Sequence, residues 1–278
     1  MSPTAPSEPA SHPHVPSTGM FDFFKSRRRK ALRAHPFPEA WRAIVSANVP
    51  YVSTLSPEDR AELEGHVRVF LDEKKFEGCG GLKITDEVRV TIASEACLLL
   101  LHRETDYFPD LEVILVYPHP YVAKSSVHLA RGVTLADEQA RLGQSASGVV
   151  VLAWDAVRRG ATDADDGHNV TLHEFAHQLD QEDGVADGAP VLPGRAMYIA
   201  WAHVLGEEFA HLVDEVDKNH RTDIDAYGAT NPAEFFAVVT EMFFGKPTAL
   251  ERRHPQLYRQ LSLFYRQDPA ARSGGRDG

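Results

Sequence analysis

The segment 168–183, HNVTLHEFAHQLDQED, constrains the fold and the function of the chain more than any other. It contains the pattern H-E-x-x-H, formed by His173, Glu174 and His177. On a helix, residues four positions apart lie on one face, so the two imidazoles can bind one metal ion. Glu174 then lies beside the open coordination position, where a zinc peptidase has its general base. Apolar residues at helical spacing predict that residues 169–180 form this helix and pack it against a core.

A catalytic zinc site needs a third protein ligand besides the two histidines. The metzincin extension of the motif would place Gly at 180 and His at 183, but this chain has Asp180 and Asp183. A thermolysin-like site would use a glutamate about twenty residues after the motif. The corresponding window, Pro193–Ala200, contains no glutamate. The carboxylates that remain as candidates are Glu207, Glu208, Glu215, Glu234 and Glu241.

Glu234 differs from the other candidates because it lies in the first turn of a predicted helix, among apolar residues. Asn231 as N-cap and Pro232 at the first position favour this helix start. A carboxylate buried there without a partner would be costly, and a metal ion would remove that cost. Glu241, seven residues later, could orient a histidine ligand, but a surface carboxylate is an equally good interpretation. Tyr227 could donate a hydrogen bond to a tetrahedral oxyanion, although alone it is more typical of a packed aromatic residue.

Two stretches, HEFAHQLD and AYGATNPAEFFAVVTEMFF, resemble the Mlc titration factor A family of zinc metallopeptidases. The stretches VVVLAWDAVRRG and QEDGVADG are similar to that family as well. The resemblance extends from Phe21 to Asp268 and is most specific between Val149 and Phe244. The active site of that family is related to the catalytic domain of anthrax lethal factor.

The resemblance implies a gluzincin site in which His173, His177 and Glu234 bind one zinc ion. It implies Glu174 as the general base and Tyr227 as the active-site tyrosine. The implied activity is hydrolysis of a peptide or protein substrate, in the manner of an aminopeptidase. The family member for which the family is named binds a glucose-responsive transcriptional repressor. The resemblance therefore also implies an alternative, a regulatory protein that sequesters such a repressor and whose peptidase activity is secondary.

The pattern of apolar residues predicts an α+β fold that is rich in helices and has a small sheet. The resemblance implies that this fold is that of a zincin-like metallopeptidase with the H-E-x-x-H helix at its active site. We expect a Pro-rich, disordered extension at residues 1–20, one metallopeptidase domain at 21–268 and a disordered tail at 269–278. Helices and strands are predicted at the spans that follow. The helices are 38–45, 56–74, 86–102, 155–159, 169–180, 196–216, 232–244 and 256–265, and the strands are 111–117 and 148–154, with 122–144 as a loop or a hairpin.

The bulk properties exclude several classes of protein. The formal net charge of −11 over 278 residues argues against nucleic acid as a partner. No apolar segment is long enough to span a membrane, and the N-terminus lacks the apolar core of a signal peptide, so we expect a cytoplasmic protein without membrane insertion. Cys79 and Cys97 form no disulfide framework, and neither lies near the motif, which disfavours a structural zinc site.

Three local interpretations concern segments outside the motif. The aromatic and basic segment Phe21–Arg33 could be a membrane-surface anchor or a nucleic-acid patch, but a solvated turn before the first helix is favoured. Glu95, within an apolar helix, is interpreted as a helix-edge carboxylate rather than a catalytic group. The strand Gly148–Trp154, if it lies at the edge of the sheet, could bind an extended peptide by β-addition.

Overall fold

The computed structural model describes residues 19–122, 140–141, 143–146, 148–162 and 167–273. The predicted disordered extension lies outside the described residues, except for Gly19 and Met20, which begin helix α1 (Gly19–Ala34). The predicted disordered tail is partly wrong, because Pro269–Ser273 form helix α11. This end of the chain is held in place where the Tyr258 hydroxyl, 2.6 Å from Asp268, accepts a hydrogen bond from Ala270 N.

Four strands form the main sheet, in the order β1-β2-β6-β5. The first three are parallel, and β5 is antiparallel to β6. The strands are β1 (Lys75–Gly78), β2 (Val113–Tyr117), β5 (Gly143–Ala146) and β6 (Val149–Ala153). The β2 and β6 strands occupy the centre of the sheet, which agrees with their continuous apolar sequences. Two further short strands, β3 (Tyr121–Val122) and β4 (Ala140–Arg141), pair with each other at the described ends of the predicted loop or hairpin.

The condition for β-addition to residues 148–154, that this strand lies at the edge of the sheet, is not met. Strand β6 pairs with β2 on one side and with β5 on the other, so no peptide can add to it. Among the described strands, β5 is the outermost on this side of the sheet, and its polar and small residues gave no strand pattern in the sequence. A peptide therefore cannot bind to β6 by β-addition, because both sides of the strand are already paired.

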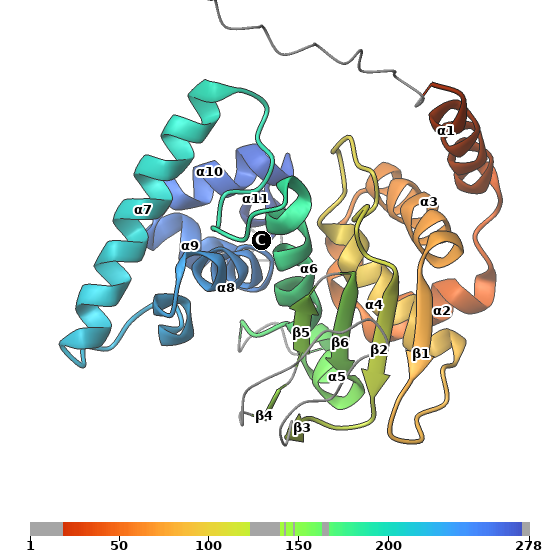
Figure 1. The fold of residues 1–278 in the computed structure, drawn as a ribbon, viewed down its shortest axis with the longest axis horizontal. Helices are drawn as coiled ribbons and strands as arrows, with labels where there is room; N and C mark the ends of the chain where they lie inside the picture. Colours follow the sequence, from red (N-terminus) through yellow and green to blue (C-terminus); the bar gives the residue numbers. More distant parts are fainter. Residues whose placement is uncertain (1–18, 123–139, 142, 147, 163–166, 274–278) are drawn as a thin grey trace, which may run out of the picture.

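The N-terminal half of the chain supplies helices on one side of the sheet (Figure 1). They are α2 (Glu39–Asn48), the 3-10 helix η1 (Pro50–Thr54), α3 (Pro57–Glu73) and α4 (Asp86–Leu98). Ser56 caps α3 as expected, because its side chain accepts a hydrogen bond of 3.0 Å from Asp59 N. Helix α4 ends at Leu98 instead of His102, which has a left-handed backbone with φ 62°.

Helix α1 shows that the favoured interpretation of Phe21–Arg33 as a solvated turn is wrong. This segment is helical and packs against α3. The buried guanidinium of Arg29 lies between the carboxylates of Glu73 and Asp106, at 2.7 and 2.5 Å. Three of the basic residues thus form intramolecular ion pairs, since Arg28 pairs with Asp72 at 2.8 Å and Lys25 with Asp106 at 2.9 Å.

The motif helix α6 (Val170–Asp180) lies between the sheet and a second group of helices (Figure 1). That group comprises α7 (Arg195–Asp217), α8 (Pro232–Gly245), α9 (Pro247–Arg253), α10 (Pro255–Tyr265) and α11. The connecting elements are α5 (Trp154–Thr162) and the 3-10 helices η2 (Gln181–Asp183) and η3 (Ala226–Ala229). The α+β prediction, rich in helix with a small sheet, is confirmed.

The position of α6 is fixed by its apolar face. Phe175 is fully buried and packs edge-on against Phe108, with ring centroids 4.9 Å apart, and against Phe70 at 5.6 Å. Aromatic pairs of this kind stabilise a core beyond the area that they bury. The histidines of the motif are thereby held on a rigid, buried helix rather than on a loop.

No helix in the described part of the chain is both long and apolar enough to span a membrane.

Candidate metal centre

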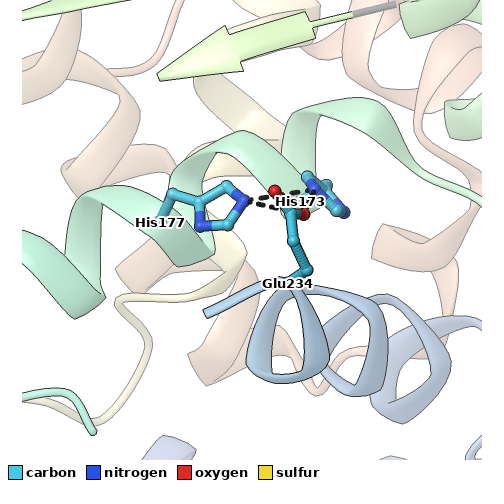
Figure 2. Close-up of side chains that lie close together, drawn as sticks. All are labelled: His173, His177 and Glu234. Atoms are coloured by element: carbon cyan, nitrogen blue, oxygen red, sulfur yellow. Dashed lines mark hydrogen bonds and ion pairs between the residues drawn. The ribbon is translucent and has the colours of Figure 1, made fainter. Parts of the chain in front are cut away.

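Helix α6 begins at a well-made N-cap. The side chain of Asn169 accepts a hydrogen bond of 2.9 Å from Leu172 N, which satisfies one of the free amides of the first turn. The following helical turns place His173 and His177 on one face, and both side chains point toward the start of α8 (Figure 2). The spacing of four residues thus places the two imidazoles on one face of α6, as the sequence predicted.

Helix α8 presents Glu234 to the two histidines. Asn231 caps this helix by accepting a hydrogen bond of 3.0 Å from Glu234 N, and Pro232 occupies the first helical position. The carboxylate of Glu234 reaches across to α6 (Figure 2). Its Oε2 lies 3.0 Å from His173 Nε2 and 3.3 Å from His177 Nε2. The two Nε2 atoms are 3.2 Å apart.

The separations of these three atoms are close to those of ligands around one metal ion. Zinc lies about 2.0–2.2 Å from imidazole nitrogen and carboxylate oxygen, so tetrahedral ligands are about 3.3–3.5 Å apart. The observed separations of 3.0–3.3 Å are close to that range. His173, His177 and Glu234 therefore form a donor set that fits one divalent cation, with neutral imidazoles and one carboxylate.

The carboxylates around His173 favour positive charge at this point. Glu241, 6% exposed, accepts a hydrogen bond of 2.7 Å from His173 Nδ1 through its Oε1. Burial disfavours a charged imidazole, but the hydrogen bonds to Glu234 and Glu241 outweigh it and raise the pKa of His173 to about 10. For Glu234, burial is likewise outweighed by hydrogen bonds to the two histidines, which hold its pKa far below the usual value. A metal cation would be stabilised by the same carboxylates.

Glu174 lies on the buried side of the site. Its side chain is 5% exposed, and within the described structure its Oε2 has no hydrogen-bond partner. Burial raises the pKa of Glu174 to about 7, although His173 and His177 act in the opposite direction. A carboxyl whose pKa is near neutrality can accept and return a proton, which is the requirement for a general base.

Tyr227 lies beside the histidines on η3. Its ring centroid is 6.0 Å from that of His173, and half of the side chain is exposed. Asp225 holds the start of η3 by accepting a hydrogen bond of 2.7 Å from Tyr227 N. The structure thus brings Tyr227 next to the site, on the side that is open to solvent.

The other candidate carboxylates lie elsewhere, on α7. Each has a histidine neighbour: Glu207 lies near His203, Glu208 near His254 and Glu215 near His220. These three glutamates therefore do not contribute to the site. Sequence reasoning missed Asn169, whose backbone N–H donates a hydrogen bond of 2.5 Å to Glu241 Oε2. Its position directly before the apolar helical pattern was the available signal.

Comparison with known proteins agrees with this geometry. The family model of the glucose-regulated metallo-peptidase M90 matches residues 23–266. The chain belongs to this family. As a member of the M90 family it is a metallopeptidase, whose substrates are peptides and whose site holds a metal.

Several relatives of the M90 chain are similar over most of their length. An uncharacterized protein of Synechocystis sp., slr2042, is 41% identical over 87% of this chain and 89% of its own. Mlc titration factor A of Klebsiella pneumoniae is 34% identical over 81% of this chain and 85% of its own. Mlc titration factor A of Pectobacterium atrosepticum is 34% identical over 84% and 88%, respectively. The family that the motif segments indicated is thereby confirmed.

Proposed function

We propose that the protein is a zinc-dependent peptidase of the gluzincin type, in which His173, His177 and Glu234 hold one zinc ion. The convergence of two imidazole nitrogens and one carboxylate oxygen within 3.0–3.3 Å carries this proposal. Two nitrogens and one oxygen, with the fourth position open, is the ligand set of catalytic zinc sites of the His₂Glu type. The family supplies the metallopeptidase class, and the donor set favours zinc within that class.

A zinc ion held by His173, His177 and Glu234 would supply Lewis-acid chemistry and would lower the pKa of a bound water toward neutrality. Glu174 takes the proton from the attacking water and passes it to the leaving amine. Its position beside the two imidazoles, on the buried side of the site, suits both transfers. The phenol of Tyr227 donates a hydrogen bond to the oxyanion that develops on the substrate carbonyl.

Glu241 and Asn169 keep the metal-binding imidazole in place. A carboxylate on Nδ1 fixes the tautomer in which Nε2 is free to bind the metal, and it prevents rotation of the ring. The Glu241 carboxylate is itself held by the amide of Asn169. These contacts would therefore hold the His173 imidazole with its Nε2 toward Glu234.

We propose an aminopeptidase-like activity, which the sequence resemblance implied. A free amino terminus on the substrate would then be required for cleavage. Amino-acid p-nitroanilides and their N-acetylated forms test this directly, because they differ only in that group. Equal cleavage of the acetylated forms would contradict the aminopeptidase activity and would leave the peptidase activity itself intact.

The Glu174→Gln variant tests the mechanism. It preserves the shape of the side chain but removes the proton acceptor, so we expect one zinc per chain and a loss of hydrolysis of at least about 100-fold. Glu207→Gln is the matched control, because this exposed residue on α7 lies away from the site. Full peptidase activity of Glu174→Gln would rule out the proposed mechanism.

A second candidate is a regulatory role in which the protein binds a transcriptional repressor. Relatives that are 34% identical to this chain are named Mlc titration factor A, and this name favours the candidate. The two functions separate in one experiment, since Glu174→Gln removes catalysis without changing the surface. A repressor that binds wild type and Glu174→Gln equally would support this role, and cleavage of the repressor by wild type alone would make it a substrate.

A further inference from the structure

Behind the metal centre, α4 contributes a buried carboxyl group that the proposed mechanism does not use. Glu95 is 1% exposed, so its interpretation as a helix-edge carboxylate is wrong. The described structure shows no cation paired with it. Its Oε1 accepts a hydrogen bond of 2.5 Å from Asn169 Nδ2. Burial of a carboxyl group without a cation costs free energy of folding, so Glu95 destabilises the fold unless its hydrogen bonds offset that cost.

The contact with Asn169 connects Glu95 to the metal centre. Asn169 uses its side-chain oxygen to cap α6 and its backbone N–H to hold Glu241 Oε2. The other oxygen of Glu241 lies 2.7 Å from Nδ1 of His173. A continuous series of hydrogen bonds thus leads from Glu95 through Asn169 and Glu241 to a proposed metal ligand.

A protonated Glu95 would also satisfy a second buried group. Within the described residues, Glu95 Oε2 and Thr171 Oγ1 are both buried without a hydrogen-bond partner of standard geometry. Burial raises the pKa of Glu95 to about 7, with Asn169 and Thr171 close enough to act against it. A proton on Oε2 could be donated to Thr171 Oγ1, in the first turn of α6. Glu95 would then hold α6 at two points.

The space around Asn169 leaves it little freedom to find another partner. Asn169 Nδ2 also donates a weaker hydrogen bond of 3.3 Å to Gly160 O, at the end of α5. At Gly160 a Cβ atom would lie only 2.9 Å from Asn169 Cα and from His168 O. Helix α5 therefore approaches the start of α6 more closely than any residue but glycine permits.

We propose that Glu95 is a positioning residue of the metal centre, which acts through Asn169 to fix Glu241 and the imidazole of His173. It does not touch the metal or the substrate. This inference rests on the proposed zinc site, because it concerns the affinity of that site. Partners of metal-bound histidines contribute about 10- to 100-fold to metal affinity, and a residue one step further away should contribute toward the lower end.

The test is the zinc affinity of the metal-free protein, measured at pH 7 by competition with a chromophoric chelator. Glu95→Leu removes the acceptor of Asn169 Nδ2, and we expect zinc to bind about 10-fold more weakly. Glu95→Gln retains a carbonyl oxygen and should bind zinc as wild type does. Ser94→Ala is the matched control, because Ser94 is buried in the same helix but its hydroxyl donates to Val90 O, within α4 itself.

A second variant tests the route through Asn169. Asn169→Ser retains an N-cap but is too short to reach Glu95, and it should weaken zinc binding as much as Glu95→Leu does. The double variant should bind no more weakly than either single variant, because both interrupt one series of contacts. If Glu95→Leu fails to fold, Asn169→Ser alone decides the matter.

Wild-type zinc affinity in a folded Glu95→Leu variant, or in Asn169→Ser, would overturn the inference. Fully additive losses in the double variant would overturn the route through Asn169. Failure of the proposed function looks different, because the wild-type protein would then bind no zinc at all.

Discussion

His173, His177 and Glu234 form one cluster of side chains that could share a cation, and Asp59, Glu62 and His102 form another. Both combine histidine and carboxylate within a short distance, and both lie partly buried. In the first cluster, three donor atoms from two helices face one point, 3.0–3.3 Å apart. The side chains there are 11–19% exposed, whereas His102 and Glu62 are 34% exposed.

The second cluster is arranged as an ion-pair network. His102 turns Nε2 toward Asp59 at 3.1 Å and Nδ1 toward Glu62 at 3.4 Å, and one imidazole cannot bind one ion through both nitrogens. The guanidinium of Arg272 already pairs with Asp59 at 3.1 Å. The difference teaches that convergence of donor atoms, rather than their chemical type, distinguishes a metal site from a charge network.

Removal of one carboxylate from each cluster should give the largest contrast. Glu234→Ala removes a proposed ligand and should weaken zinc binding by more than about 100-fold, since even indirect partners contribute up to that much. Glu62→Ala should leave zinc binding unchanged. Chelator competition measures both. If the two variants lost zinc equally, the distinction between the clusters would be wrong.

Glu241→Gln should have the next largest effect. The neutral amide is a weaker acceptor for His173 Nδ1 than the carboxylate is. We therefore expect zinc affinity to fall by about 10- to 100-fold. Glu208→Gln is the matched control, because Glu208 also pairs with a histidine, His254, at 2.8 Å, but away from the site. Isothermal titration of metal-free protein with zinc measures both. An unchanged affinity in Glu241→Gln would remove Glu241 from the account.

The pH dependence of stability should separate Glu95 from Glu62. Burial raises the pKa of Glu95 from 4.5 to about 7, so the stability that its protonated form contributes is complete below pH 4.5 and is lost as the pH rises through 7. This difference corresponds to about 3 kcal/mol at most. A hydrogen bond to His66 lowers the pKa of Glu62, so its contribution has the opposite sign and is lost as the pH falls below 4.5.

Urea unfolding at pH 5 and pH 8, with chelator present, measures this effect. Relative to Glu95→Gln, wild type should lose free energy of unfolding between the two pH values, by up to about 2.5 kcal/mol, because a small part is already lost at pH 5. The Glu62→Gln variant should retain the wild-type loss. A wild type and a Glu95→Gln variant with the same pH dependence would show that Glu95 is ionised like an exposed carboxylate.

The smallest effect is expected from the N-caps of the helices that carry the two clusters. Asn231→Ala and Ser56→Ala each remove a side chain that accepts from the first turn, and each should cost about 1 kcal/mol in the free energy of unfolding. Only Asn231→Ala should also weaken zinc binding, because α8 carries Glu234 and α3 carries none of the three proposed ligands. Equal zinc affinities in the two variants would show that the cap does not position Glu234.

Much of the site could be predicted from the sequence because its signals are local. The spacing of His173 and His177 specifies one face of a helix, and Asn231-Pro232 specifies where the next helix starts. Glu234 in that first turn could then be favoured before its position was known. Glu241 remained ambiguous, because its partner His173 is 68 positions away.

The errors have non-local causes. Glu95 was interpreted as a helix-edge residue because its partner Asn169, 74 positions away, gives no signal within α4. Whether β6 lies at an edge stayed open in the sequence, because its neighbour β5 lacks the apolar alternation of a strand. Helix α1 is held by Glu73 and Asp106, and the end of the chain by the Tyr258 hydroxyl, and no periodicity predicts such contacts.

The most direct test of the central claim is X-ray absorption at the zinc edge on the purified, zinc-loaded protein. We predict two imidazole nitrogens and one or more oxygens at about 2.0–2.2 Å, with one zinc per chain. The Glu234→Ala variant, prepared in the same way, should lack this zinc signal. A sulfur ligand at about 2.3 Å, which only Cys79, Cys97 or the methionines could supply, would contradict the site, as would a wild-type protein that retains no metal.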